Sequence, residues 1–151
     1  DVDGVYDYVV QPVLHEFASA AFEDVCRQFV KEQQKKNELP FRYAKMGRWI
    51  GKTTVRDENA ENGLRNAETE IDLLCIDREA KKYLVGECKF KGKAFSYSEY
   101  LNTLAKLTPL KKNAVFYYAL YSESGFDQKI IDEAPQNHTQ LYSLEQIVSG
   151  V

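Results

Sequence analysis

Two acidic residues stand on neighbouring strands of a predicted β-hairpin, where they could share a cation. Residues 70–77 and 83–90 are rich in β-forming apolar side chains and are separated by a short charged turn, as in an antiparallel hairpin. With a four-residue turn over 78–81, Asp72 lies opposite Glu87. Directly opposed Cβ atoms are roughly 5 Å apart, so these carboxylates repel one another unless a proton or a cation lies between them.

A hard divalent cation would relieve this repulsion. Mg²⁺, with Mn²⁺ as its substitute, binds through one or two carboxylates, keeps several waters and completes its shell with phosphate oxygens. Lys89 lies on the face of Glu87 and could hold or deprotonate an attacking water, or stabilise a transferring phosphoryl group. Glu70 is an auxiliary candidate, because the same register places it opposite Lys89. The alternative is an amphipathic hairpin whose charges simply face solvent.

The elements that position this hairpin predict an α/β fold with a central mixed sheet. The first three strands form an antiparallel meander, and later strands are joined through crossover helices that leave helices on both faces. Residues 56–68 are polar and read as a loop. The predicted elements are a helix from Pro12 to about Glu32, strands over 41–50, 70–77 and 83–90, a helix capped by Ser96 and ending near Leu107, a strand over 114–121, a helix over 126–134, a strand over 139–142 and a helical turn capped by Ser143.

Length and composition indicate one globular domain. The chain has 151 residues, of which 44% are hydrophobic and 28% charged, which excludes a disordered tail or a disulfide scaffold. We expect the domain over 12–151, and a linker or a strand from an upstream domain over 1–11. No apolar run approaches the ~20 residues of a membrane helix, so no membrane partner is expected. The three cysteines lack zinc or redox spacing and predict a reducing, cytoplasmic location.

The charge distribution is uneven along the chain. The net charge of −3 does not by itself suggest a polyanionic partner, yet residues 41–56 carry five basic and no acidic side chains. Aromatic residues interleave with these, so the segment could contact a nucleic-acid backbone and stack on bases; a half-exposed strand with core aromatics is the alternative. The candidate nucleic-acid contacts are Arg48, Lys52, Lys91 and Lys93.

The acidic hairpin also resembles a known superfamily. Asp72, the triplet Glu87-Cys88-Lys89 and an upstream helix carrying Glu23 are similar to the PD-(D/E)xK nucleases, which have the restriction-endonuclease-like fold, although Ile71 replaces the namesake proline. More narrowly, residues 12 to 148 resemble the C-terminal domain of archaeal-type AAA+ ATPases. The segments that carry this likeness are 22–29, 47–49, 70–72 and 86–89.

The resemblance implies a metal-dependent nuclease that hydrolyses phosphodiester bonds, with DNA as the expected substrate. It makes Asp72 and Glu87 the metal ligands for Mg²⁺ or Mn²⁺, Lys89 the catalytic lysine and Glu23 a helix-borne acidic residue of the site. It also implies ATPase and winged-helix domains upstream in the parent chain. The alternative function is a non-catalytic DNA-binding, regulatory or protein-interaction domain of the same ATPase.

Overall fold

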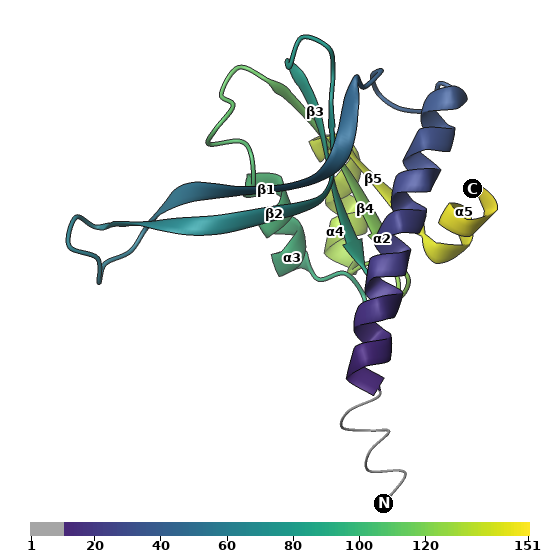
Figure 1. The fold of residues 1–151 in the computed structure, drawn as a ribbon, viewed down its shortest axis with the longest axis horizontal. Helices are drawn as coiled ribbons and strands as arrows, with labels where there is room; N and C mark the ends of the chain where they lie inside the picture. Colours follow the sequence, from purple (N-terminus) through teal and green to yellow (C-terminus); the bar gives the residue numbers. More distant parts are fainter. Residues whose placement is uncertain (1–10) are drawn as a thin grey trace, which may run out of the picture.

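A five-stranded mixed sheet of order β1-β2-β3-β4-β5 forms the centre of the fold (Figure 1). The computed structural model describes residues 11–151, so the predicted linker or strand over 1–11 lies outside these residues except for Gln11. The elements are α2 (Gln11–Lys35), β1 (Lys45–Arg56), β2 (Leu64–Ile76), β3 (Lys82–Lys89), α3 (Tyr97–Ala105), β4 (Val115–Ser122), α4 (Gln128–Glu133), the short 3-10 helix η2 (Ala134–Asn137), β5 (Thr139–Ser143) and α5 (Leu144–Ser149).

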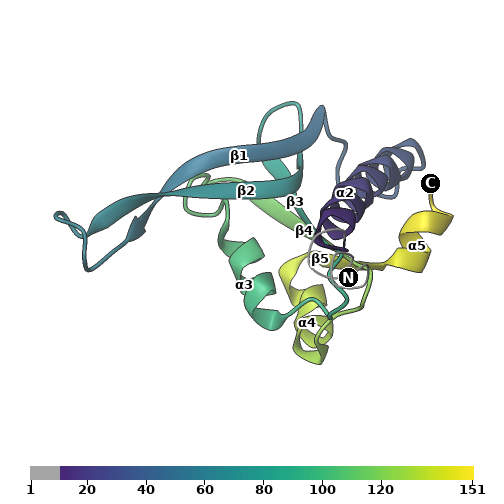
Figure 2. The same cartoon turned by 60° about the horizontal axis from the view of Figure 1, so that its bottom comes forward.

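The predicted topology is confirmed at the level of a mixed sheet flanked by helices. Strands β1, β2 and β3 pair antiparallel, whereas β3, β4 and β5 pair parallel through the crossovers that contain α3 and α4. Figure 2 shows α2 and α5 on one side of the sheet and α3 and α4 on the other. No helix among the described residues has the length and apolar character needed to cross a membrane.

Helix α2 covers one face of the sheet because its apolar residues recur every three or four positions. Phe22, Cys26, Phe29 and Val30 are buried at this spacing. They pack against inward-facing residues of β2, β3 and β4, together with Ile147 of α5. The buried strand residues of this core are Leu73, Cys75, Leu84, Cys88, Ala119 and Tyr121.

The opposite face is covered by α3 and α4. Beneath the end of α3, Leu107 is buried in a cluster with Ile71 and Leu74 of β2 and Val85 of β3. Helix α3 itself begins at the predicted Ser96 cap, whose side chain accepts a hydrogen bond from the Glu99 amide in a capping box. The crossover helix is therefore fixed at its start by its own sequence and at its end by the core.

Strands β1 and β2 extend into an arm that projects beyond the body of the domain (Figures 1 and 2). The loop predicted over 56–68 is too long, because the two strands pair out to Arg56 and Leu64 and residues 64–68 belong to β2. Only residues 57–63 form the tip, closed by a hydrogen bond from the Asp57 amide to the Gly63 carbonyl oxygen. Antiparallel pairing satisfies the backbone of this polar segment without a core beneath it.

An irregularity in the sheet lies at the base of this arm. Gly47 pairs with Leu74 and Trp49 with Ile71, so Arg48 alone stands opposite the two residues Asp72 and Leu73. Such a β-bulge changes which face the following residues occupy. Strict alternation predicts Ile71 on the face of Leu73; instead Ile71 is buried with Leu74 on the α3 side.

Candidate functional site

Strands β2 and β3 separate at Asp72. Their pairing runs from Ile76 and Tyr83 to Leu73 and Gly86, in the register that the four-residue turn predicts. Beyond Gly86, Oδ2 of Asp72 accepts a hydrogen bond from the Cys88 amide at 2.9 Å, while β3 goes on pairing with β4. The carboxylate therefore occupies the fork between the strands, where it replaces a backbone partner.

The side chain of Arg27 on α2 also contacts Asp72. Nη1 of Arg27 donates to the backbone carbonyl oxygen of Asp72 at 3.1 Å, and Nη2 forms an ion pair with Asp24. This contact fixes the bulged backbone of β2 against the helix. The position of Asp72 is thus set by three elements, namely the bulge, β3 and α2.

Glu87 is buried beside Asp72, with only 4% of its surface exposed. Burial is the main cause that raises its pKa to about 7, and the charge of Asp72 and a hydrogen bond with its side chain raise it further. A hydrogen bond from Lys106 and its positive charge lower the pKa of Glu87, but by less than the other effects raise it. The structure therefore brings Asp72 and Glu87 together as a partly desolvated acidic pair.

Glu23 reaches the same place from α2. Its pKa is raised, first by partial burial, then by the charge of Asp72 and a hydrogen bond with that side chain. Asp72 thus lies between Glu23 and Glu87. Among the residues whose side chains the structure describes, 18–52 and 54–151, however, no group of three or more His, Cys, Asp or Glu side chains is arranged to hold a metal ion. Any cation bound here would take only some of its ligands from the protein.

Lys106, which sequence analysis did not single out, contacts the acidic pair directly. It follows α3 as the C-cap residue, and its Nζ donates to Oε1 of Glu87 and to the backbone carbonyl oxygen of Glu70. The sequence does predict that α3 ends near Leu107. Finding Lys106 would have required knowing that the end of α3 lies over Val85 and Glu87.

Lys89 and Glu70 do not pair with one another, contrary to the predicted contact. Nζ of Lys89 lies 3.4 Å from Oε2 of Glu99 in the first turn of α3, and Glu70 forms an ion pair of 3.0 Å with Arg48. The reason is that β2 and β3 diverge at Asp72, so the predicted register does not continue to Glu70. Lys89 lies two residues beyond Glu87, two-thirds buried at the edge of the site.

The carboxylate of Glu99 forms ion pairs with two lysines, Lys89 and Lys91. Burial acts to raise its pKa, but hydrogen bonds from Lys91 and Ser96 and the charge of Lys89 lower it to about 2. Glu99 is therefore ionised at neutral pH and holds both lysines at the start of α3.

The other predicted nucleic-acid contacts lie in different surroundings. Arg48 is exposed and lies near enough to Glu23 and Asp72 for their charges to raise its pKa, after the larger effect of Glu70. Lys52 is exposed on the arm opposite Glu68, and Lys93 is exposed beyond the end of β3. The structure thus brings Arg48 close to the acidic site, pairs Lys91 with Glu99 and leaves Lys52 and Lys93 exposed.

A groove borders this site. It has a volume of about 750 Å³ and runs between the arm and the end of α3, with Glu70 and Lys106 in its wall. Asn102 and Pro109 line the α3 side. The groove gives an extended ligand room to pass beside the acidic pair.

Comparison with known proteins places the chain in a recognised family and supports the fold. The model of DUF234, described as "Archaea bacterial proteins of unknown function", matches residues 1–102. An uncharacterized protein, MJECL04 from Methanocaldococcus jannaschii, is 29% identical over 90 residues, which are 59% of this chain and 17% of that protein. The chain therefore spans about a sixth of the length of this relative.

The comparison with solved structures finds two crystal structures. Protein VC1899 from Vibrio cholerae superposes with a TM-score of 0.56 at 18% identity, over 85% of this chain and 30% of that one. A protein of unknown function, AF1548, gives a TM-score of 0.44 at 15% identity, over 79% of this chain and 57% of that one. The similarity to VC1899 supports the fold alone.

Proposed function

The chain belongs to the DUF234 family of archaeal and bacterial proteins, and from that premise we propose that its domain is a metal-dependent nuclease of the PD-(D/E)xK type with a restriction-endonuclease-like fold. It would hydrolyse phosphodiester bonds of DNA. The observation that carries this proposal is the convergence of Asp72 and Glu87 at the fork of β2 and β3, where desolvation and mutual repulsion raise the pKa of Glu87 to about 7.

The residues present fit Mg²⁺ or Mn²⁺. Two carboxylates suit a hard cation that keeps several waters and accepts phosphate oxygens. The buried carboxylate of Glu87 already contacts one cationic group, the ammonium of Lys106, and a metal would share or replace this contact. When bound by Asp72 and Glu87, the metal would polarise the phosphate and lower the pKa of the attacking water.

The remaining roles fall to side chains around the pair. Lys89, the proposed catalytic lysine, would stabilise the charge that develops on the phosphoryl oxygens from its position beside Glu99. Glu23, which contacts Asp72, would bind a water molecule or accept a proton at the site. Arg48 and Lys91 would contact flanking phosphates close to the site, with Lys52 and Lys93 farther along the strand.

A second candidate function is supported by Lys106. Its ammonium group neutralises Glu87 without any metal, which would suit a non-catalytic DNA-binding or regulatory domain. The domain spans a small part of its relative's length. For either function we propose that it serves upstream ATPase and winged-helix domains of the parent chain.

Plasmid nicking in Mg²⁺ or Mn²⁺, combined with calorimetric titration of Mn²⁺, tests the proposal. We expect cleavage and metal binding in the wild type, loss of both in Asp72→Asn, and loss of cleavage with retained metal binding in Lys89→Ala. Glu79→Gln is the matched control, because Glu79 is an exposed acid in the hairpin turn. Failure to bind metal would refute the nuclease. Salt-sensitive DNA binding without turnover would then favour the second function.

A further inference from the structure

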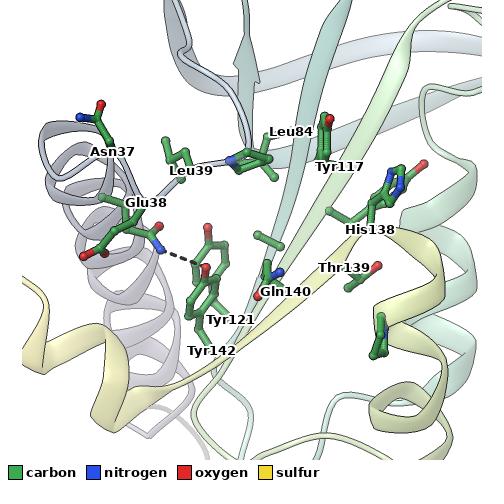
Figure 3. Close-up of a pocket in the computed structure, with 15 residues that line it drawn as sticks. Asn37, Glu38, Leu39, Leu84, Tyr117, Tyr121, His138, Thr139, Gln140 and Tyr142 are labelled. Carbon is green, nitrogen blue, oxygen red and sulfur yellow. Dashed lines mark hydrogen bonds between the residues drawn. The ribbon is translucent and has the colours of Figure 1, made fainter.

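A separate pocket of about 440 Å³ lies on the α2 side of the sheet (Figure 3). Its wall is built from the end of α2, the loop that follows it, and strands β4 and β5, which contribute Gln33, Glu38, Tyr121 and Tyr142. None of the acidic-site residues lines it. Its volume lies within the range of small-molecule sites, roughly 300 to 1,000 Å³.

Two buried polar atoms in the wall of this pocket have no hydrogen-bond partner among the described residues. They are the hydroxyl oxygen of Tyr121, whose side chain is fully buried, and Oε1 of Gln33, which is 4% exposed. Nε2 of Gln33 donates to the Tyr142 hydroxyl at 2.9 Å, so the carbonyl end of the amide is the free end. Burying such groups without partners is costly, so a ligand that pairs with them would be favoured.

The hydroxyl of Tyr121 and the amide oxygen of Gln33 can form different kinds of hydrogen bond with a ligand. Burial raises the pKa of Tyr121 well above its usual value, so its neutral hydroxyl can donate a hydrogen bond. The amide oxygen of Gln33 can only accept one. A ligand that presents an acceptor next to a donor on one edge would satisfy both atoms at once and would use the Tyr121 hydroxyl as a donor.

The charge and the shape of the pocket restrict the class of ligand that it can bind. Glu38 lines the pocket, and none of the described lysines or arginines does, which disfavours a phosphate or a carboxylate. Two stacked ring pairs form flat walls. The ring of Tyr121 stacks on that of Tyr142 with centroids 5.4 Å apart, and the ring of Tyr117 stacks on that of His138 at 5.2 Å. All four side chains are labelled in Figure 3. A planar, uncharged ring with amino hydrogens fits these features.

We propose that this pocket binds a purine or pyrimidine base that carries an exocyclic amine. The amine donates to Oε1 of Gln33 and to the carboxylate of Glu38, and a neighbouring ring nitrogen or carbonyl accepts from Tyr121. The base can come from a free nucleoside or from an unpaired position in a nucleic-acid strand. The inference does not depend on the proposed nuclease, because the two sites share no residues.

Calorimetric titration with two matched nucleoside pairs tests the inference. Adenosine and inosine differ at the exocyclic amine, as do cytidine and uridine. We expect saturable binding of adenosine or cytidine, at least tenfold tighter than its deaminated partner. No saturable binding of any nucleoside, as when only water fills the pocket, overturns the proposal. Equal affinity within both pairs overturns it too.

Variants of the wall locate the binding. Tyr121→Phe removes only the unpartnered hydroxyl and Glu38→Gln only the charge, so each should weaken binding at least fivefold while the melting temperature shows that the fold is kept. Tyr83→Phe is the matched control, because Tyr83 is a buried tyrosine on the opposite face of the sheet. Asp72→Asn should leave nucleoside affinity unchanged even if it abolishes cleavage. Unchanged affinity in Tyr121→Phe would contradict the assignment.

A short single-stranded oligonucleotide distinguishes the two sources. If a strand supplies the base, the oligonucleotide should bind more tightly than the nucleoside and lose affinity in Tyr121→Phe. If the ligand is a free nucleoside, Tyr121→Phe should weaken nucleoside binding and leave oligonucleotide binding unchanged.

Discussion

The carboxylate of Asp72 accepts a hydrogen bond from the backbone amide of Cys88, the residue between Glu87 and Lys89. A side chain thereby takes the place that the next backbone carbonyl of a continuous antiparallel ladder would occupy. This single contact ends the pairing of β2 with β3 and brings the Asp72 carboxylate to the side chain of Glu87. The acidic pair is therefore a consequence of how the sheet divides.

The raised pKa of Glu87 predicts a pH-dependent stability. Between its usual pKa of 4.5 and the folded value of about 7, the folded protein holds a proton that the unfolded chain has released. Stability of the metal-free protein should thus fall as pH rises through this window, by on the order of 3 kcal/mol. Glu87→Gln should lack this decline. Urea unfolding in EDTA at pH 4.5, 6 and 8 measures it, and parallel curves for the two proteins would contradict the prediction.

Removal of Lys106 should destabilise the metal-free protein. Lys106→Met leaves the buried Glu87 without its cation, and we expect a loss of about 2 kcal/mol at pH 8. The loss should shrink at pH 5, where Glu87 is protonated. Mn²⁺ should raise the melting temperature of Lys106→Met more than that of the wild type. Lys93→Met, at an exposed lysine, is the control and should change stability by less than about 0.5 kcal/mol.

Gly86→Ala should disturb the strand that carries Glu87. A Cβ atom on Gly86 would lie 3.1 Å from the Leu73 Cβ and 3.2 Å from its carbonyl oxygen, at the last paired position before the fork. We expect a loss of about 1 to 2 kcal/mol in chemical unfolding. Gly47→Ala is the matched control in β1, because nothing lies within 4 Å of its added Cβ. If both variants were neutral, the close contact with Leu73 would not exist.

The capping box of α3 should contribute to the stability of the domain. Ser96 accepts from the Glu99 amide at 3.2 Å, and the Glu99 carboxylate accepts from the Ser96 amide at 2.9 Å. Ser96→Ala should therefore cost about 1 kcal/mol in thermal or urea unfolding. Ser98→Ala, two residues on at an exposed helical position, should have little effect or stabilise slightly. Equal effects of the two changes would argue against the cap.

Local signals in the sequence predicted the parts of the site that depend on neighbouring residues. The turn length of the hairpin sets the pairing of Leu73 with Gly86, and the serine and glutamate three residues apart set the start of α3. These features follow from backbone geometry within a few residues. The sequence therefore predicted correctly that strands β2 and β3 bring Asp72 near Glu87.

Features that depend on distant packing were not predictable in this way. Lys106 reaches Glu87 only because the end of α3 packs over β2 and β3. The contact expected between Glu70 and Lys89 assumed an uninterrupted ladder, whereas the bulge and the fork send them to Arg48 and Glu99. The extension of β1 and β2 into the arm was missed because its polar composition resembles that of a loop.

The extra residue in β2 also sets which face each residue of the arm occupies. Inserted at Asp72 and Leu73, it decides which side of the ribbon every residue from Ile71 outward presents. A regular ladder through both residues would turn Ile71 out of the core and Glu70 toward it, whereas deleting one of the two would restore plain alternation and leave Ile71 on the face of Leu74. Point substitutions in the arm should be tolerated far better than changes in its length, and insertions should be accepted only at the 57–63 tip.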